Sequence, residues 1–90
     1  MKIIPNSDLF FRNLRYLRQK YKYTQKQVGR VLGVGQLTVR YMERGNWRPE
    51  LDWAWPELDW AWLERLGWLF GCDGAELLEK DFEAEDKAKQ

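Results

Sequence analysis

The side chains best suited to bind a ligand in this chain are its cations, and they are concentrated in one half. Residues 1–48 contain 11 Lys and Arg but 2 Asp and Glu, a balance of +9, whereas residues 49–90 contain 4 Lys and Arg and 12 Asp and Glu, a balance of −8. The net charge of +1 hides this division. A basic half attracts a polyanion, most simply nucleic acid, and an acidic half can form a solvated face, a tail or a docking surface for a basic partner.

Residues suited to catalysis or metal binding are scarce. The sequence has no histidine and one cysteine, Cys72, so we expect no zinc site and no catalysis by a histidine base or a cysteine nucleophile. Cys72 is expected to be a small core residue in a reducing cytoplasm. No apolar run reaches the roughly 20 residues of a membrane span, and no signal peptide is visible. We therefore expect a cytoplasmic protein that is not an enzyme and uses no metal, cofactor, small-molecule ligand or membrane.

The basic half is predicted to form three short helices. The first runs over about 8–22, with Ser7 as its N-cap and apolar residues at helical spacing. Thr24 and Gln27 form a capping box for a second helix over about 25–32, which ends at the turn glycine Gly33. A third helix over about 35–45 ends at Gly45.

The acidic half is predicted to add two helices and a tail. The fourth helix runs over about 56–71 and carries two apolar stripes, which is more than a small core requires. A capping box from Asp73 to Glu76 opens a short helix, "AELLEKDF". Residues 83–90 are charged, lack an apolar face and are expected to be a disordered tail. The prediction is an all-α fold, a compact bundle of about five short helices over residues 1–82.

The stretch "TQKQVGRVLGVGQLTVRYMERG", residues 24–45, resembles the helix-turn-helix of the phage-repressor and Cro family, also called the XRE family. Gly29 falls where that family needs a small residue between the two helices, and Gly33 falls at the turn. The positions that the family buries are apolar here: Val28, Leu32, Val34, Val39 and Met42. Arg18 and Glu43 fall where the family has an ion pair, so we predict an Arg18–Glu43 pair.

The resemblance implies a lambda-repressor-like fold, with the third helix in the major groove of double-stranded DNA. The residues placed to touch base edges are Gln36, Leu37, Thr38, Arg40 and Tyr41. Those placed to hold the phosphate backbone are Gln25, Arg44 and Arg48. The sequence departs from the family after Pro49. The segment from Pro49 to Gly71 is about one heptapeptide longer than the family's segment between the corresponding positions.

That extra length is a tandem copy, "PELDWAW" at 49–55 and again at 56–62, which carries four of the six tryptophans. Seven residues are close to two helical turns, but Pro56 prevents an unbroken helix. The first copy forms either a short turn of its own or a kinked extension of the fourth helix. The surplus apolar residues predict an interface with a second copy of the chain or another protein: Trp53, Trp55, Trp60, Leu63 and Phe70. The alternative is a duplication without a function.

Two functions therefore compete. The first is a sequence-specific, repressor-like transcriptional regulator that binds double-stranded DNA as a homodimer. The second is an antitoxin or adaptor whose acidic, tryptophan-rich half binds a protein partner.

Overall fold

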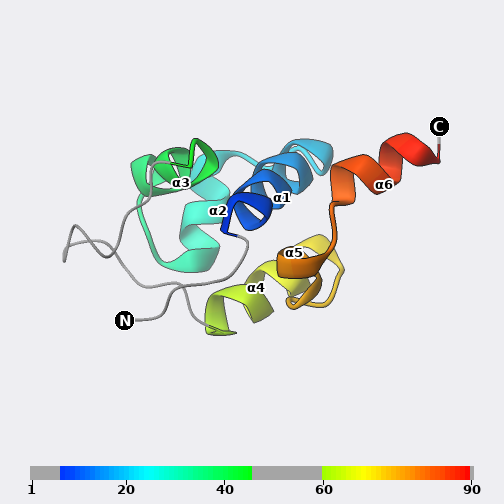
Figure 1. Ribbon diagram of the computed structural model, residues 1–90. Helices are drawn as coiled ribbons and strands as arrows, with labels where there is room; N and C mark the ends of the chain where they lie inside the picture. The colour runs from blue at the N-terminus through cyan, green and yellow to red at the C-terminus, as the bar shows by residue number, and fades with distance from the viewer. Residues whose placement is uncertain (1–6, 46–59, 90) are drawn as a thin grey trace.

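The computed structural model describes residues 7–45 and 60–89, and these two ranges fold into six α-helices without a strand (Figure 1). The helices are α1 (Ser7–Lys20), α2 (Gln25–Leu32), α3 (Gln36–Glu43), α4 (Trp60–Phe70), α5 (Glu76–Glu79) and α6 (Phe82–Ala88). The predicted all-α fold is confirmed. Helix α1 is central, because it packs against α3 on one side and against α5 and α6 on the other.

The core is built from the apolar stripes that the helical spacing predicted. Phe10, Leu14 and Leu17 line the inner side of α1 and are 0–2% exposed. They meet buried side chains from the four following helices: Val28, Leu32, Val39, Met42, Trp62, Leu63, Leu66, Phe70 and Leu77. Each large apolar side chain buried in this way stabilises the fold by about 1.5–3 kcal/mol. The core therefore joins the basic and the acidic halves of the sequence into one packed unit.

The α2–turn–α3 segment follows its local sequence signals. Thr24 and Gln27 form the predicted capping box. The backbone N–H of Gln27 donates to Thr24 Oγ1 at 3.0 Å, and the backbone N–H of Thr24 donates to Gln27 Oε1 at 2.8 Å. Gly33 ends α2 in the left-handed conformation, at φ 77°. A Cβ atom on Gly29 would lie 2.7 Å from the carbonyl oxygen of Val34. The close approach of the turn to α2 thus requires a glycine at position 29.

A buried asparagine joins α1 to the C-terminal helices. Asn13 is 1% exposed, and its Nδ2 donates to the carbonyl oxygens of Leu77 at 2.9 Å and Lys80 at 2.6 Å. Its Oδ1 accepts the backbone amide of Phe82 at 3.2 Å. One side chain therefore satisfies backbone groups at the end of α5 and at the start of α6, where no helix partner is available.

The prediction of a disordered tail over residues 83–90 was wrong, because Phe82–Ala88 form α6. The expected "AELLEKDF" helix is also broken: α5 ends at Glu79, and Lys80 is extended. Contacts with α1 explain why α6 forms without a strong apolar face. Asp86 accepts hydrogen bonds from the Tyr16 hydroxyl at 2.5 Å and from Lys20 Nζ at 2.8 Å. Both hydrogen bonds lower the pKa of the Asp86 carboxyl, and the one from Lys20 has the larger effect.

The close packing at Gly29 can be tested by adding one methyl group. We expect Gly29→Ala to lower the free energy of unfolding by about 1–3 kcal/mol, because the new Cβ atom forces the backbone of the turn away from α2. Urea denaturation measures this change. Gly35→Ser is the control, since a Cβ at Gly35 meets no atom within 4 Å and a serine there can cap α3. The control should be at least as stable as the parent chain. Equal stability of Gly29→Ala and the parent would contradict the packing argument.

Candidate nucleic-acid interface

Helix α3 has a buried face and an exposed face. Val39 and Met42 are fully buried against the core. Four of the five residues predicted to touch base edges are exposed on the other side: Gln36, Leu37, Arg40 and Tyr41. Leu37 is 57% exposed, which is a high value for a leucine in a folded helix. Thr38, the fifth, is half-buried on the flank of the helix. The two-turn helix thus presents polar, basic and apolar side chains together to the solvent.

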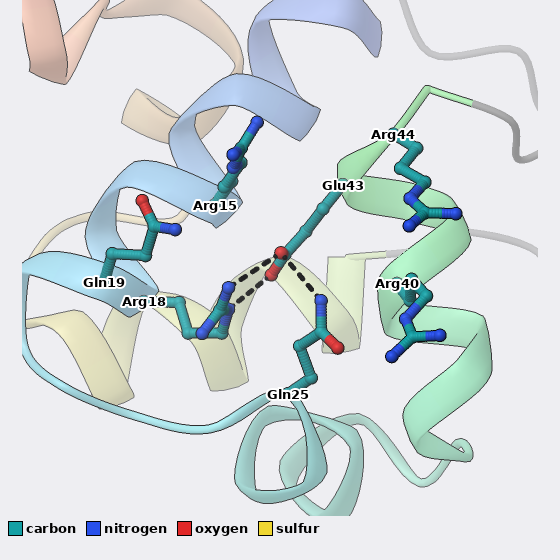
Figure 2. A pocket seen from close by; sticks show the side chains of 7 residues that line it. All are labelled: Arg15, Arg18, Gln19, Gln25, Arg40, Glu43 and Arg44. Carbon is teal, nitrogen blue, oxygen red and sulfur yellow. Dashed lines mark hydrogen bonds and ion pairs between the residues drawn. The ribbon is translucent and has the colours of Figure 1, made fainter.

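A hollow of about 250 Å³ lies beside this face, between α1, the start of α2 and α3 (Figure 2). Arg40 and Arg44 enter it from α3, and Arg15 and Gln19 enter it from α1; the remaining lining residues are Arg18, Gln25 and Glu43. Of these, Gln25, Arg40 and Arg44 were predicted as contact residues from the sequence. Arg15 and Gln19 were not, although their spacing of four residues places both on one face of α1.

The Arg18–Glu43 ion pair predicted from the sequence is present at the base of the hollow (Figure 2). Arg18 Nε and Nη2 donate to the two Glu43 oxygens at 2.6 and 3.0 Å, a bidentate arrangement that fixes both side chains. The two side chains are 14% and 4% exposed, so the pair is shielded from solvent. Arg18 Nη1 also donates to the carbonyl oxygen of Tyr23 at 3.0 Å. The pair therefore links α1, the α1–α2 turn and the last turn of α3.

Gln25 completes this network. Its Nε2 donates to Glu43 Oε1 at 3.2 Å, so the Glu43 carboxylate accepts three hydrogen bonds from two different helices. Gln25 is half-buried, and its amide group points toward Glu43 in Figure 2. Its position thus explains how the start of α2 is held against the end of α3.

The balance of charge around the hollow is strongly positive. Four arginines line it against one carboxylate, and that carboxylate is occupied by Arg18. Across residues 7–45 and 60–89, no Asp or Glu forms an ion pair with Arg15, Arg40 or Arg44. Like charges held close together in this way attract an anion with several negative groups, such as a phosphodiester backbone.

Several predicted site residues lie elsewhere. Arg48, Trp53 and Trp55 are outside the described ranges, whereas Trp60 is 61% exposed at the start of α4. Leu63 and Phe70 were expected at a partner interface, but they are 2% and 4% exposed and belong to the core.

Contacts within the chain explain why Leu63 and Phe70 of α4 are buried. A Cβ on Gly74 would lie 2.5 Å from the Leu63 carbonyl oxygen, so the loop after α4 lies directly against the helix at Leu63. The Phe70 ring stacks on Tyr21, with ring centroids 6.2 Å apart.

Residues 10–79 match a family described as a helix-turn-helix domain. The match covers most of the chain, including α2, the turn and α3. The chain belongs to this helix-turn-helix family. No curated protein and no solved structure is similar enough to be matched.

The helix-turn-helix assignment agrees with the arrangement in Figure 1, where α2 and α3 are joined by a tight turn, α1 packs against α3, and α4 packs against α2. It also agrees with the resemblance to the phage-repressor and Cro family. The match ends at residue 79, so α6 lies beyond the family's common part. Among the described residues, no cluster of His, Cys, Asp or Glu could hold a metal ion. None of the described helices combines the length and the apolar composition that a membrane span needs.

The shielded ion pair predicts an asymmetric response to mutation. We expect Arg18→Met to lower the free energy of unfolding by about 3–5 kcal/mol, because it leaves the Glu43 charge buried without its partner. The double variant Arg18→Met/Glu43→Leu should recover most of that loss, since it removes both charges. Thermal and urea denaturation of the two variants measure the difference. A single variant as stable as the parent, or a double variant no more stable than the single one, would show that the pair does not hold α3.

Proposed function

We propose that this protein is a sequence-specific, repressor-like transcriptional regulator that binds double-stranded DNA through α3, without an enzymatic step. The observation that carries the proposal is the exposed face of α3 next to the arginine-lined hollow. A helix fits the major groove of B-form DNA, and basic residues on a neighbouring helix can then reach the flanking phosphates.

The exposed residues of α3 supply three kinds of base contact. Gln36, at the start of the helix, can form two hydrogen bonds with an adenine, an interaction worth about 1–3 kcal/mol of discrimination. Leu37 can touch the methyl group of a thymine. Arg40 can read a guanine or hold a phosphate. Tyr41 is exposed one turn on from Leu37, and half-buried Thr38 is a proposed contact at the edge of the groove.

The phosphate contacts are proposed to come from both sides of the hollow. Arg44 continues the Gln36–Arg40 row on α3, and Arg15 with Gln19 forms a second row on α1. A backbone strand between these rows would meet three guanidinium groups that no described carboxylate neutralises. Gln25 also remains a proposed phosphate contact, and so does Arg48, which lies outside the described residues. Gln25 can fulfil that role only with the part of its amide that Glu43 does not use.

The contacts of the acidic half weigh against the alternative in which it covers a basic protein partner. Asp81 pairs with Arg12, Asp86 with Lys20, and Glu83 with Lys87. Glu76 and Glu85 both pair with Lys80. Much of the negative charge of α5 and α6 is therefore used within the chain, and some of it holds α6 on α1. We propose a homodimer as the form that binds DNA, because two copies can read two half-sites.

The proposed base contact of Gln36 and the proposed phosphate contact of Arg44 should respond differently to mutation. For a duplex selected from a random library by the parent chain, we expect Gln36→Ala to reduce discrimination at one base pair by about 1–3 kcal/mol. We expect Arg44→Ala to weaken binding to every duplex and to reduce the slope of log K against log salt by about one. Fluorescence anisotropy at several salt concentrations measures both effects.

Lys87→Ala is the matched control, since it also removes one positive charge but lies on α6, with its side chain 70% exposed. It should leave the base preference and the salt slope nearly unchanged. A parent chain that binds selected and random duplexes equally well would contradict sequence-specific binding. An Arg44→Ala effect no larger than that of Lys87→Ala would contradict the assignment of the hollow.

A further inference from the structure

A second hollow lies beyond the Arg15–Gln19 row, between α1 and α6. Its volume is about 360 Å³, and it is lined by Arg12, Arg15, Tyr16, Gln19 and Glu83. Arg15 and Gln19 also line the first hollow, so the two hollows are neighbours that share this row of α1. Helices α3 and α6 lie on different sides of α1 in Figure 1. The surface that we propose to bind phosphates therefore continues around α1 toward α6.

Arg12 extends the row by one turn of α1. It precedes Arg15 by three residues and Gln19 by seven, which places the three side chains on one face of the helix. The side chain of Arg12 is 63% exposed, so a ligand in solution can reach it. The row from Arg12 to Gln19 is about 10 Å long. That length can follow more than one phosphate of a DNA strand, whose charges recur about every 3.4 Å along the axis.

Arg12 differs from Arg15 because a carboxylate of α6 holds it. Arg12 Nη2 donates to Asp81 Oδ2 at 3.2 Å. The other carboxylate oxygen, Asp81 Oδ1, accepts the backbone N–H of Ala84 at 3.1 Å and caps α6. Asp81 is thus fixed by the helix that it caps, whereas the long side chain of Arg12 can turn to another acceptor. An ion pair as exposed as this one is weak, so a phosphate can compete with the carboxylate for Arg12.

Helix α6 has other contacts that hold it on α1 when Arg12 turns away. The Asn13 side chain accepts the backbone N–H of Phe82, and the Asp86 carboxylate accepts hydrogen bonds from Tyr16 and Lys20. None of these contacts involves Arg12. An exchange of partners at Arg12 is therefore confined to one side chain and leaves α6 in place.

We propose that Arg12 is a further phosphate contact and that Asp81 competes with the DNA backbone for it. The proposal rests on the proposed DNA binding and adds a contact within the chain that limits its affinity. While Asp81 holds Arg12, the row of available cations ends at Arg15. Glu83 places a second carboxylate on the α6 side of the hollow, so α6 opposes the approach of a polyanion to this end of α1.

The competing carboxylate lies outside the part of the chain that the family shares. The match to the helix-turn-helix family ends at residue 79, and Asp81 follows it. The limit on affinity is therefore a feature that α6 adds to the domain.

Asp81→Asn tests the competition and keeps the cap of α6, because asparagine caps a helix about as well as aspartate does. With a random-sequence duplex at about 0.1 M salt, we expect the Kd of the full chain to fall about two- to fivefold. We also expect log K to fall more steeply with log salt, because Arg12 then contacts phosphate without a competitor. Fluorescence anisotropy measures both effects. Asp81→Ser, which retains a capping side chain, should give the same result.

Glu85→Gln is the matched control. It removes the same charge from α6, and the two side chains are similarly exposed, at 42% for Glu85 and 37% for Asp81. Glu85 pairs with Lys80 and not with α1, and Lys80 keeps its second partner, Glu76. This control should change the Kd by less than about 1.5-fold. In an Arg12→Gln background, Asp81→Asn has no cation to release and should have no more effect than Glu85→Gln. Circular dichroism checks that each variant is folded.

Two results would overturn this proposal alone. In the first, Asp81→Asn binds the duplex no more tightly than Glu85→Gln does. In the second, Asp81→Asn strengthens binding as much in the Arg12→Gln background as in the parent chain. Either result is compatible with a parent chain that binds DNA and is weakened by Arg44→Ala, so the proposed function would stand. A parent chain that binds no duplex at low salt would overturn both proposals.

Discussion

The position of α3 depends on the buried ion pair between Arg18 and Glu43. Apolar contacts through Val39 and Met42 bury one face of the helix in the core, and the ion pair adds a polar contact at its last turn. The bidentate pair sets the last turn of α3 against α1, and the Gln25 amide ties the same carboxylate to α2. A pair shielded from water tolerates few alternative geometries, since loss of either partner leaves a buried charge. The orientation of Arg40 and Arg44 follows from this constraint.

The charged residues of the basic half and those of the acidic half have different roles in the folded chain. In the basic half, one carboxylate is used for structure, and Arg15, Arg40 and Arg44 remain without an acidic partner in the described ranges. In the acidic half, many carboxylates pair with lysine or arginine, and Asp86 holds α6 on α1 through Lys20 and Tyr16. The positive side is thus kept available for a ligand, while much of the negative side stabilises the fold. The net charge of +1 does not reveal this difference between the two halves.

Local signals predicted the fold well, and features that depend on distant contacts were missed. The capping box at Thr24 and the glycine at 33 act within a few residues, so their pattern was sufficient to place α2 and the turn. Helix α6 depends on side chains of α1, whose partners lie 66 to 70 residues away in the sequence. Arg15 could be assigned to the hollow only once the side of α1 that faces α3 was known. Phe70 was predicted at a partner interface, but its ring packs against Tyr21 and Tyr23, which lie far from α4 in the sequence.

We propose that DNA binds to the surface formed by α3 and the side of α1 that carries Arg15 and Gln19. Titration of the ¹⁵N-labelled chain with duplex DNA, followed by NMR chemical shifts, tests it most directly. We expect the largest chemical-shift changes at residues 36–44 and at Arg15 and Gln19, and we expect these changes to weaken as the salt concentration is raised. Amides of α4 and α6 should change little when the protein concentration is held constant. Changes confined to α4–α6, or none at low salt, would contradict it.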